Sequence, residues 1–224
     1  MVKLIIFDWD DVFTLGAKEG YYACYRKAIN DVGVNLSPEE ENKRILAKWG
    51  KSFKEELKEL LKEKPELIDT ASEIFERAYW GDTFVDALSV IEGTNEMLVR
   101  LKDKYKLAVA TGNHHKMLKD RIFPHFSIPD VFLQIISSHE IEDQEKTKPH
   151  PYMLEVIMKN LNVSPNETIF VGDAKTDVQM AYSADVEPVV VLSGHLSKEE
   201  AKELGVKHII DNVTLLEKEL ERFN

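Results

Sequence analysis

Hydrophobic residues occur along this chain in short continuous runs, each followed by polar residues. The runs are rich in β-branched residues and have no polar interruption, which is typical of strands buried on both faces of a parallel sheet. We expect such strands at residues 3–7, 106–110, 133–136, 168–171, 188–192 and 208–210. Helical patterns separate most of them. This alternation predicts an α/β fold with a doubly wound parallel sheet.

Residues 17–90 lack this alternation and have helical spacing throughout. Ser37 and Ser52 are each followed three residues later by Glu, the pattern of a helix-starting capping box, and Pro38 occupies a first helical position. Pro65 marks the start of a further helix. Because this segment has no strand partner, we predict an inserted α-helical cap domain at 16–90 and a core domain at 1–15 and 91–224.

Composition narrows the class of protein. The 224 residues can form one large domain or a core with an insert. A net charge of −11 gives no indication of a nucleic-acid or membrane partner. Cys24 is the only cysteine, so an intrachain disulfide and a cysteine-based zinc cluster are excluded. With no signal-like segment, we expect a cytoplasmic protein that is a monomer by default.

The polar residues after the first run are Asp8 and Asp10, separated by Trp9. In open α/β sheets ligands bind beyond the carboxyl ends of the strands, where these carboxylates are expected to lie. A carboxylate there can attack phosphorus, and a second one can hold a proton for the leaving oxygen. Mg²⁺ between them would offset their repulsion of a phosphate. The alternative is a surface turn after an edge strand.

The next run ends in Thr111, Gly112 and Asn113. A hydroxyl and free backbone N–H groups at a helix N-terminus form an anion site. The alternative is an ordinary helix N-cap with a glycine turn. His114 and His115 follow in the expected first helical turn, and for them we expect surface or supporting roles.

Three further residues complete the pattern. Lys148, before Pro149, can neutralise the charge of a nucleophile and a phosphate together. Asp173 follows the strand that ends at Gly172 and can bind Mg²⁺, and Asp177 can orient Lys148 or the metal ligands. Each has an ordinary alternative, a solvated lysine or a capped strand–helix turn. Their joint occurrence at strand ends favours one metal-assisted phosphate site.

In this order, the motifs resemble those of the haloacid dehalogenase-like superfamily, in its branch with an α-helical cap that includes phosphoglycolate phosphatase and beta-phosphoglucomutase. The resemblance covers nearly the whole chain. It rests on the segments Phe7–Phe13, Ala110–Asn113, Lys148–Pro149 and Val171–Asp173, with Asp177.

The resemblance implies a role for each motif residue. Asp8 would be the nucleophile and Asp10 the general acid and base. Mg²⁺ would be held by Asp8, Asp173 and the backbone carbonyl of Asp10. Thr111 and Lys148 would bind the phosphoryl group, together with the backbone at Gly112 and Asn113, and Asp177 would support the metal or the lysine. Asp11 stands where this branch commonly has glycine or asparagine.

The expected function is therefore Mg²⁺-dependent hydrolysis of a small phosphate monoester, a phosphorylated metabolite, through a phosphoaspartate on Asp8. Asp10 argues against dehalogenation, which needs no acid for the leaving group. A sugar phosphomutase of the same superfamily and a non-catalytic phosphate- or metal-binding protein remain as alternatives. Substrate choice is expected in the cap, where the candidates are Tyr21, Tyr22, Arg26, Trp49, Lys51 and Phe53.

Overall fold

The computed structural model describes residues 1–48 and 52–223, which divide into two compact units. The core unit contains residues 1–15 and those from 89 onward, and the helical unit contains Gly16–Leu88. Each unit has its own buried apolar residues. In the described part of the chain, no helix is both long enough and apolar enough to span a membrane.

The core unit contains a six-stranded sheet in which every neighbouring pair is parallel. The strands in spatial order are β5 (Phe132–Ser137), β4 (Lys106–Thr111), β1 (Leu4–Phe7), β6 (Thr168–Gly172), β7 (Glu187–Val191) and β8 (His208–Ile210). Leu4 pairs with Lys106 on one side and with Thr168 on the other, so β1 is central. All four residues of β1 are buried, as its apolar run predicts.

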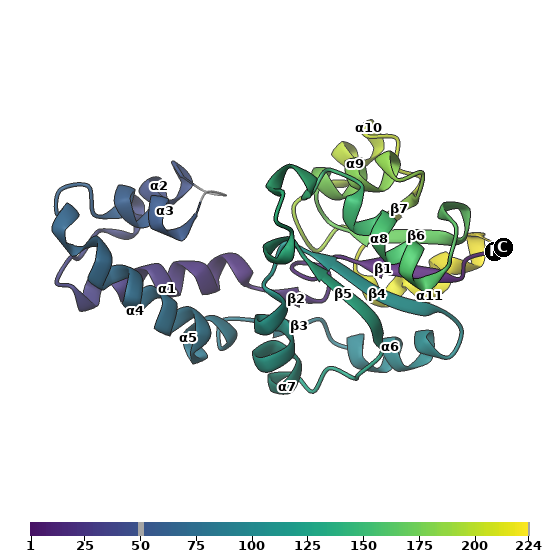
Figure 1. Cartoon of the computed structure of the whole chain (residues 1–224), viewed down its shortest axis with the longest axis horizontal. Coiled ribbons are helices and arrows are strands. Elements are labelled where there is room, and N and C mark those ends of the chain that lie inside the picture. The colour runs from purple at the N-terminus through teal and green to yellow at the C-terminus, as the bar shows by residue number, and fades with distance from the viewer. Residues whose placement is uncertain (49–51, 224) are drawn as a thin grey trace. The chain divides into compact units, whose positions relative to one another are not determined.

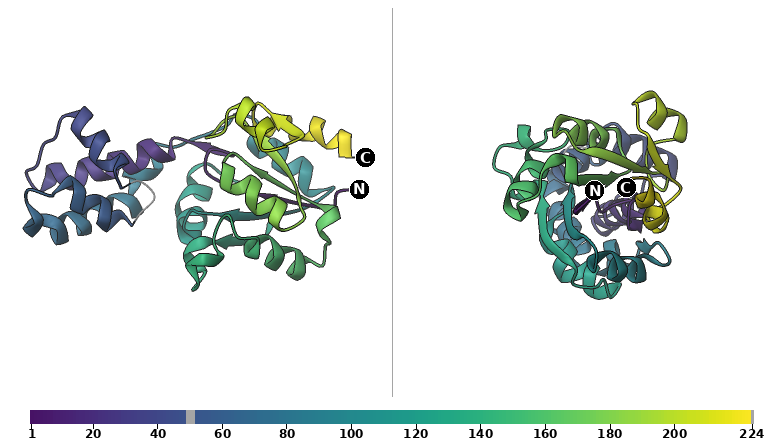
Figure 2. Two further views of the ribbon diagram at one scale, coloured as in Figure 1. Left: turned by 90° about the horizontal axis from the view of Figure 1, so that it is seen from above. Right: turned by 90° about the vertical axis from the view of Figure 1, so that its right-hand side faces the viewer.

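Helices cover both faces of this sheet. α8 and α9 share an apolar cluster with β1, β4 and β6, whereas α6 and α11 pack against β4 and β8. In the left view of Figure 2, the green α8 and the yellow α11 lie on opposite sides of the strands. The helices of this unit are α6 (Thr94–Lys102), α7 (Phe123–His125), α8 (Tyr152–Leu161), α9 (Lys175–Ser183), α10 (Lys198–Glu203) and α11 (Leu216–Leu220). The prediction of a doubly wound α/β core is confirmed.

Short helical turns connect these elements. They are the π-helical η2 (Met117–Ile122) and the 3₁₀ turns η3 (Ser138–Glu140), η4 (Gln144–Lys146), η5 (Pro165–Glu167), η6 (Val213–Leu215) and η7 (Glu221–Phe223). The helix expected from about Asn113 is present: helical residues begin at His115 and continue through η2 and α7. Side chains hold the intervening backbone: the Asn113 carboxamide oxygen accepts from the His114 N–H, and the Ser137 hydroxyl donates to the Asn113 carbonyl.

A small antiparallel ribbon was absent from the sequence prediction. β2 (Thr14–Leu15) pairs with β3 (Ser89–Val90), with Thr14 opposite Val90 and Leu15 opposite Ser89. The expectation of helix up to residue 90 is therefore wrong for Ser89 and Val90. Two residues cannot display a strand periodicity, so the ribbon leaves no pattern in the sequence.

The helical unit comprises α1 (Ala17–Asp31), α2 (Pro38–Leu46), α3 (Phe53–Leu60), η1 (Pro65–Leu67), α4 (Ile68–Trp80) and α5 (Asp82–Val85). Figure 1 shows α1, in purple, running beside α4. Aromatic rings fill the space between these helices, with Tyr25 stacked on Phe75 at 4.5 Å. The expected helix starts at Ser37 and Ser52 are confirmed, because each hydroxyl accepts the N–H three residues later.

Candidate active site

The predicted site residues converge at the carboxyl ends of three adjacent strands. Asp8 and Asp10 follow β1, Asn113 follows β4 and Asp173 follows β6. The Asn113 carboxamide donates to Asp10 Oδ1 over 3.2 Å, which joins the loops after β1 and β4. Convergence follows from the strand order β4-β1-β6, since parallel neighbours end at the same edge of the sheet.

Lys148, in the loop before α8, contacts the carboxylates of Asp8 and Asp177. Its Nζ lies 2.8 Å from Asp8 Oδ1 and 2.8 Å from Asp177 Oδ1, and its side chain is only 13% exposed. Burial acts to lower the pKa of Lys148, but Asp177 and Asp8 together raise it above its ordinary value. The lysine is therefore a fixed positive charge between two carboxylates.

Asp8 and Asp10, which follow β1, have raised pKa values. Burial raises the pKa of Asp8 to about 7, although Lys148 acts in the opposite direction. Burial likewise raises the pKa of Asp10 to about 7, opposed by the hydrogen bond from Asn113 and reinforced by Asp11. A carboxyl group with a pKa near 7 can both release and accept a proton at neutral pH, which suits an acid and base catalyst.

The loop after β4 is held by its own side chains. Thr111 is fully buried, and its hydroxyl accepts the backbone N–H of Asn113 over 3.0 Å. Gly112 is exposed, and a methyl group added there would meet no atom within 4 Å. Beyond this loop, the rings of His114 and His139 stack at 5.1 Å, and His115 Nδ1 lies 2.9 Å from Glu140 Oε1. The hydroxyl and amide of this loop are thus at the strand edge, as expected.

Asp177 shapes the loop after β6. Its Oδ2 accepts the backbone N–H groups of Asp173 and Ala174, each over 3.1 Å, while its Oδ1 contacts Lys148. Oδ2 thereby holds the loop backbone, and Oδ1 forms the ion pair with the lysine. Asp177 is 1% exposed, so it acts from within the structure as an anchor for the loop and for the lysine.

Sequence reasoning missed a further set of site residues, in the loop after β7. Asp173 Oδ2 accepts a hydrogen bond from the backbone N–H of His195 over 2.9 Å. The same oxygen lies 2.8 Å from Nδ1 of the His195 ring, within hydrogen-bond distance. The bond with Asp173 raises the pKa of His195 to about 9. Ser193 donates its hydroxyl to the Asp11 carbonyl over 2.6 Å. The rule that found the other residues, a polar group directly after a buried strand, applies here too.

The donor set fits a divalent metal ion. Carboxylate oxygens of Asp8, Asp173 and Asp177 lie within 4.8 Å of one another, and ligand atoms of Asp11, Asp173 and His195 form a second such group. Asp173 belongs to both groups and is 2% exposed. Hard cations such as Mg²⁺ prefer oxygen ligands, and a cation would offset the carboxylate charge that Lys148 alone does not balance. The carboxyl group of Asp10 belongs to neither group.

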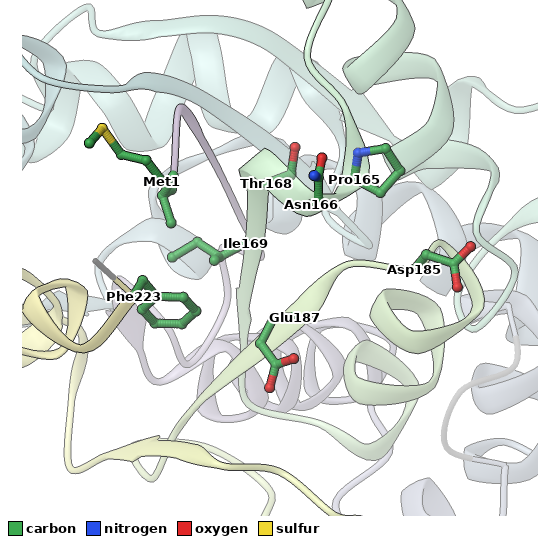
Figure 3. A pocket seen from close by; sticks show the side chains of 9 residues that line it. Met1, Pro165, Asn166, Thr168, Ile169, Asp185, Glu187 and Phe223 are labelled. Carbon is green, nitrogen blue, oxygen red and sulfur yellow. The ribbon is translucent and has the colours of Figure 1, made fainter.

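A separate pocket lies at the opposite ends of the strands. This pocket has a volume of about 290 Å³. Figure 3 shows the residues that help to line it, among them Met1, Asn166, Thr168, Asp185, Glu187 and Phe223. Thr168 and Glu187 are the first residues of β6 and β7. None of the predicted site residues lines it.

Four of the six residues expected to recognise the substrate lie among the described residues of the helical unit. Trp49 and Lys51 lie outside the described residues. The ring of Phe53 stacks on Phe75 at 4.8 Å, Tyr21 stacks on Tyr79 at 5.7 Å, and the Tyr22 hydroxyl donates to Asn42. Arg26 forms a two-point contact with Glu41. These side chains therefore have partners within the helical unit.

Comparison with known proteins gives a consistent result. The model of a hydrolase family, described as haloacid dehalogenase-like hydrolase, matches residues 2–185. A phosphoglycolate phosphatase of Colwellia psychrerythraea is 28% identical over 132 residues, 58% of this chain and 57% of that protein. A phosphorylated carbohydrates phosphatase of Thermotoga maritima is 24% identical over 84% of each chain.

Solved structures share the fold. The crystal structure of a predicted phosphoglycolate phosphatase from Haemophilus somnus superposes with a TM-score of 0.78, at 21% identity over 97% of each chain. Among the curated relatives, this chain spans 57% of the first protein and 51% of a second, a phosphoglycolate phosphatase of Haemophilus influenzae.

Proposed function

Since the chain belongs to the haloacid dehalogenase-like hydrolase family, we propose that it is a phosphatase that hydrolyses small phosphate monoesters with the aid of Mg²⁺. The observation that carries this proposal is the buried contact of Lys148 with Asp8, next to Asp10, at the carboxyl ends of the strands. A nucleophile, a proton carrier and a fixed cation are the groups that phosphoryl transfer through an enzyme carboxylate requires.

In the first step, a carboxylate oxygen of Asp8 attacks phosphorus and the bond to the leaving oxygen breaks. Asp10 donates its proton to that oxygen. Its pKa of about 7 means that a large fraction of the carboxyl is protonated at neutral pH. Lys148 stabilises the negative charge on the phosphoryl group as it approaches Asp8.

In the second step, water attacks the phosphorus of the phosphoaspartate and the bond to Asp8 breaks. Asp10, now ionised, accepts a proton from this water, so it returns to its starting state. Asn113, which bonds to Asp10 Oδ1, would keep the carboxyl group in place through both steps. Phosphate leaves, and the carboxylate of Asp8 is restored.

Several residues support these steps. Asp8 and Asp173, with the backbone carbonyl of Asp10, would hold Mg²⁺, which when bound neutralises phosphate charge. The Thr111 hydroxyl and the backbone N–H groups of the loop after β4 would bind phosphoryl oxygens. Asp177 would hold Lys148 in place. We also propose that residues 16–90 form a cap domain that determines the choice of substrate.

The relatives suggest which substrates to examine. They carry the names phosphoglycolate phosphatase, phosphorylated carbohydrates phosphatase and, in Bacillus mycoides, pyrophosphatase. Phosphoglycolate, sugar phosphates and pyrophosphate are therefore the first substrates to test.

The experiment is release of phosphate from p-nitrophenyl phosphate, with Mg²⁺ and with a chelator. We expect turnover with Mg²⁺, none with the chelator, and none for Asp8→Asn. The Asp10→Asn variant should still allow Asp8 to attack phosphorus, but its turnover rate should fall about 10²–10⁴-fold, the range for loss of a general acid or base. Asp130→Asn is the matched control, because the Asp130 side chain is 94% exposed and lies outside the site.

Each outcome has a distinct meaning. Turnover by Asp8→Asn at the wild-type rate would refute the nucleophile. Turnover in the presence of the chelator would refute the metal requirement. Transfer of phosphate between positions of a sugar phosphate, without release, would identify a phosphomutase instead.

A further inference from the structure

The loop after β7 bonds to both acidic loops of the site. The Leu196 N–H donates to the Asp173 carbonyl over 2.9 Å, in addition to the backbone and side-chain bonds from His195 to Asp173 Oδ2. From the same loop, Ser193 reaches the Asp11 carbonyl. Residues 193–196 thus connect the loop after β1 with the loop after β6.

Asp173 receives both His195 donors on one oxygen. The backbone N–H and Nδ1 of His195 lie 2.9 Å and 2.8 Å from Oδ2. An ionised carboxylate only accepts hydrogen bonds, so Nδ1 is the protonated nitrogen in this contact. The two donors on Oδ2 restrain the Asp173 carboxylate, and Oδ1 would then be the oxygen offered to a metal ion.

Gly194 allows this contact to form. A methyl group added there would lie 2.0 Å from Asp173 Oδ2, closer than any real contact. The backbone at residue 194 therefore passes directly against the carboxylate. Any other residue would move either the loop or Asp173.

We propose that His195 is a positioning residue: its imidazole holds Asp173 in the orientation that binds the metal ion, with Gly194 permitting the close approach. The inference rests on the proposed function, because it concerns the same metal. Partners that orient a metal ligand in this way typically contribute 10–100-fold to metal affinity. His195 is the side chain in this loop that donates to Asp173, and its side chain is 69% exposed, so the lower end of that range applies.

Two substitutions separate the hydrogen bond from the bulk of the ring. In His195→Asn the side-chain amide nitrogen occupies nearly the position of Nδ1 and can still donate to Asp173. In His195→Leu the donor is lost while a side chain of similar reach remains. His115→Leu is the matched control, because it removes an imidazole that contacts a different carboxylate, Glu140.

The measurement is Mg²⁺ binding to the 224-residue protein by titration calorimetry, without substrate. We expect His195→Leu to raise the Kd about tenfold, and His195→Asn and His115→Leu to stay within about twofold of wild type. In kinetics, His195→Leu should raise the Mg²⁺ concentration for half-maximal activity and leave kcat at saturating Mg²⁺ nearly unchanged. Circular dichroism of the metal-free variants checks that they are folded.

The outcomes separate this inference from the proposed function. Wild type and His195→Leu with equal affinity for Mg²⁺ would overturn the positioning role alone. An equal loss in His195→Asn and His195→Leu would also overturn it, since the donor would then be irrelevant. Wild type that binds no Mg²⁺ would overturn the metal requirement and the positioning role together.

Discussion

A methyl group added at Gly172 would lie 2.6 Å from both Cβ and Oδ2 of Asp177. Asp177 in turn accepts two backbone N–H groups and contacts Lys148. The absence of a side chain at one position thus determines where a buried carboxylate lies, and through it the position of the lysine. At the residue scale, the site depends on this close packing as much as on its charges.

Gly172→Ala tests that dependence. The added methyl group must displace Asp177 or the strand end, and overpacking of this kind costs about 1–3 kcal/mol of unfolding free energy. Urea unfolding of the variant should show a loss in this range. Gly112→Ala is the control for stability, because a methyl group there meets nothing within 4 Å. A Gly172→Ala protein as stable as wild type would show that the strand end adapts freely.

A pH effect on stability is expected at Glu167, far from the site residues. Its hydrogen bonds with Lys3 and then Ser164 lower its pKa to about 2 from an ordinary 4.5. A carboxyl group whose pKa is lowered by folding adds stability above its unfolded pKa and loses it as pH falls through its folded pKa. The contribution of ionised Glu167 to the unfolding free energy should therefore be complete above about pH 5 and disappear between pH 4.5 and 2.

The measurement for Glu167 is the urea midpoint of Glu167→Gln against wild type from pH 7 to 2. The two midpoints should differ at neutral pH and converge as the solution becomes acidic. Lys3→Met, which removes the first partner, should show the same convergence. Midpoints that differ by the same amount at every pH would contradict the expectation.

At the element scale, helix starts in the helical unit depend on single hydroxyl groups. Ser37 accepts the Glu40 N–H over 3.2 Å at the start of α2, with Pro38 at the first helical position. Ser37→Ala should lower the unfolding free energy by about 1 kcal/mol, whereas Ser37→Gly should cost only a few tenths. Thermal or urea unfolding followed by circular dichroism measures both. Equal losses in the two variants would indicate a role for Ser37 other than capping.

Strands and most helices could be predicted from the sequence because burial and periodicity leave a local pattern. The run at 3–7 gave β1, and the run at 208–210 gave β8 with its observed bounds. The ribbon Thr14–Leu15 with Ser89–Val90 could not be predicted, since its pairing joins residues far apart in the chain.

The candidate site likewise has features that the sequence predicts and features that it does not. The residue types and their places at strand ends were visible in the sequence, because parallel strands bring their carboxyl ends together. The contacts of Lys148 with Asp8 and Asp177 agree with the roles expected for these residues, whereas the contact of His195 with Asp173 could be found only from three-dimensional distances. A local motif carries no information of that kind.

At the scale of the whole molecule, the core unit holds the sheet, all the predicted site residues and both described chain ends. Because Leu15 and Ser89 are directly paired, two residues can replace the helical unit between them. Asn-Gly favours the tight turn that such a hairpin needs. We expect the protein with residues 16–88 replaced by Asn-Gly to fold, with a helical and strand circular dichroism spectrum and one cooperative unfolding transition. A non-cooperative transition would show that the core unit needs the helical unit for stability.

The same ribbon has a genetic consequence. The helical unit is one continuous stretch of the chain, and the residues that flank it, Leu15 and Ser89, pair with each other. A recombination event with crossovers at these junctions would exchange the whole segment as a cassette and leave the codons for Asp8, Lys148 and Asp173 untouched. If residues 16–90 determine the choice of substrate, as proposed above, substrate range and chemical machinery would be inherited separately, and chimeras made at these two junctions would take the substrate range of the donor of the segment.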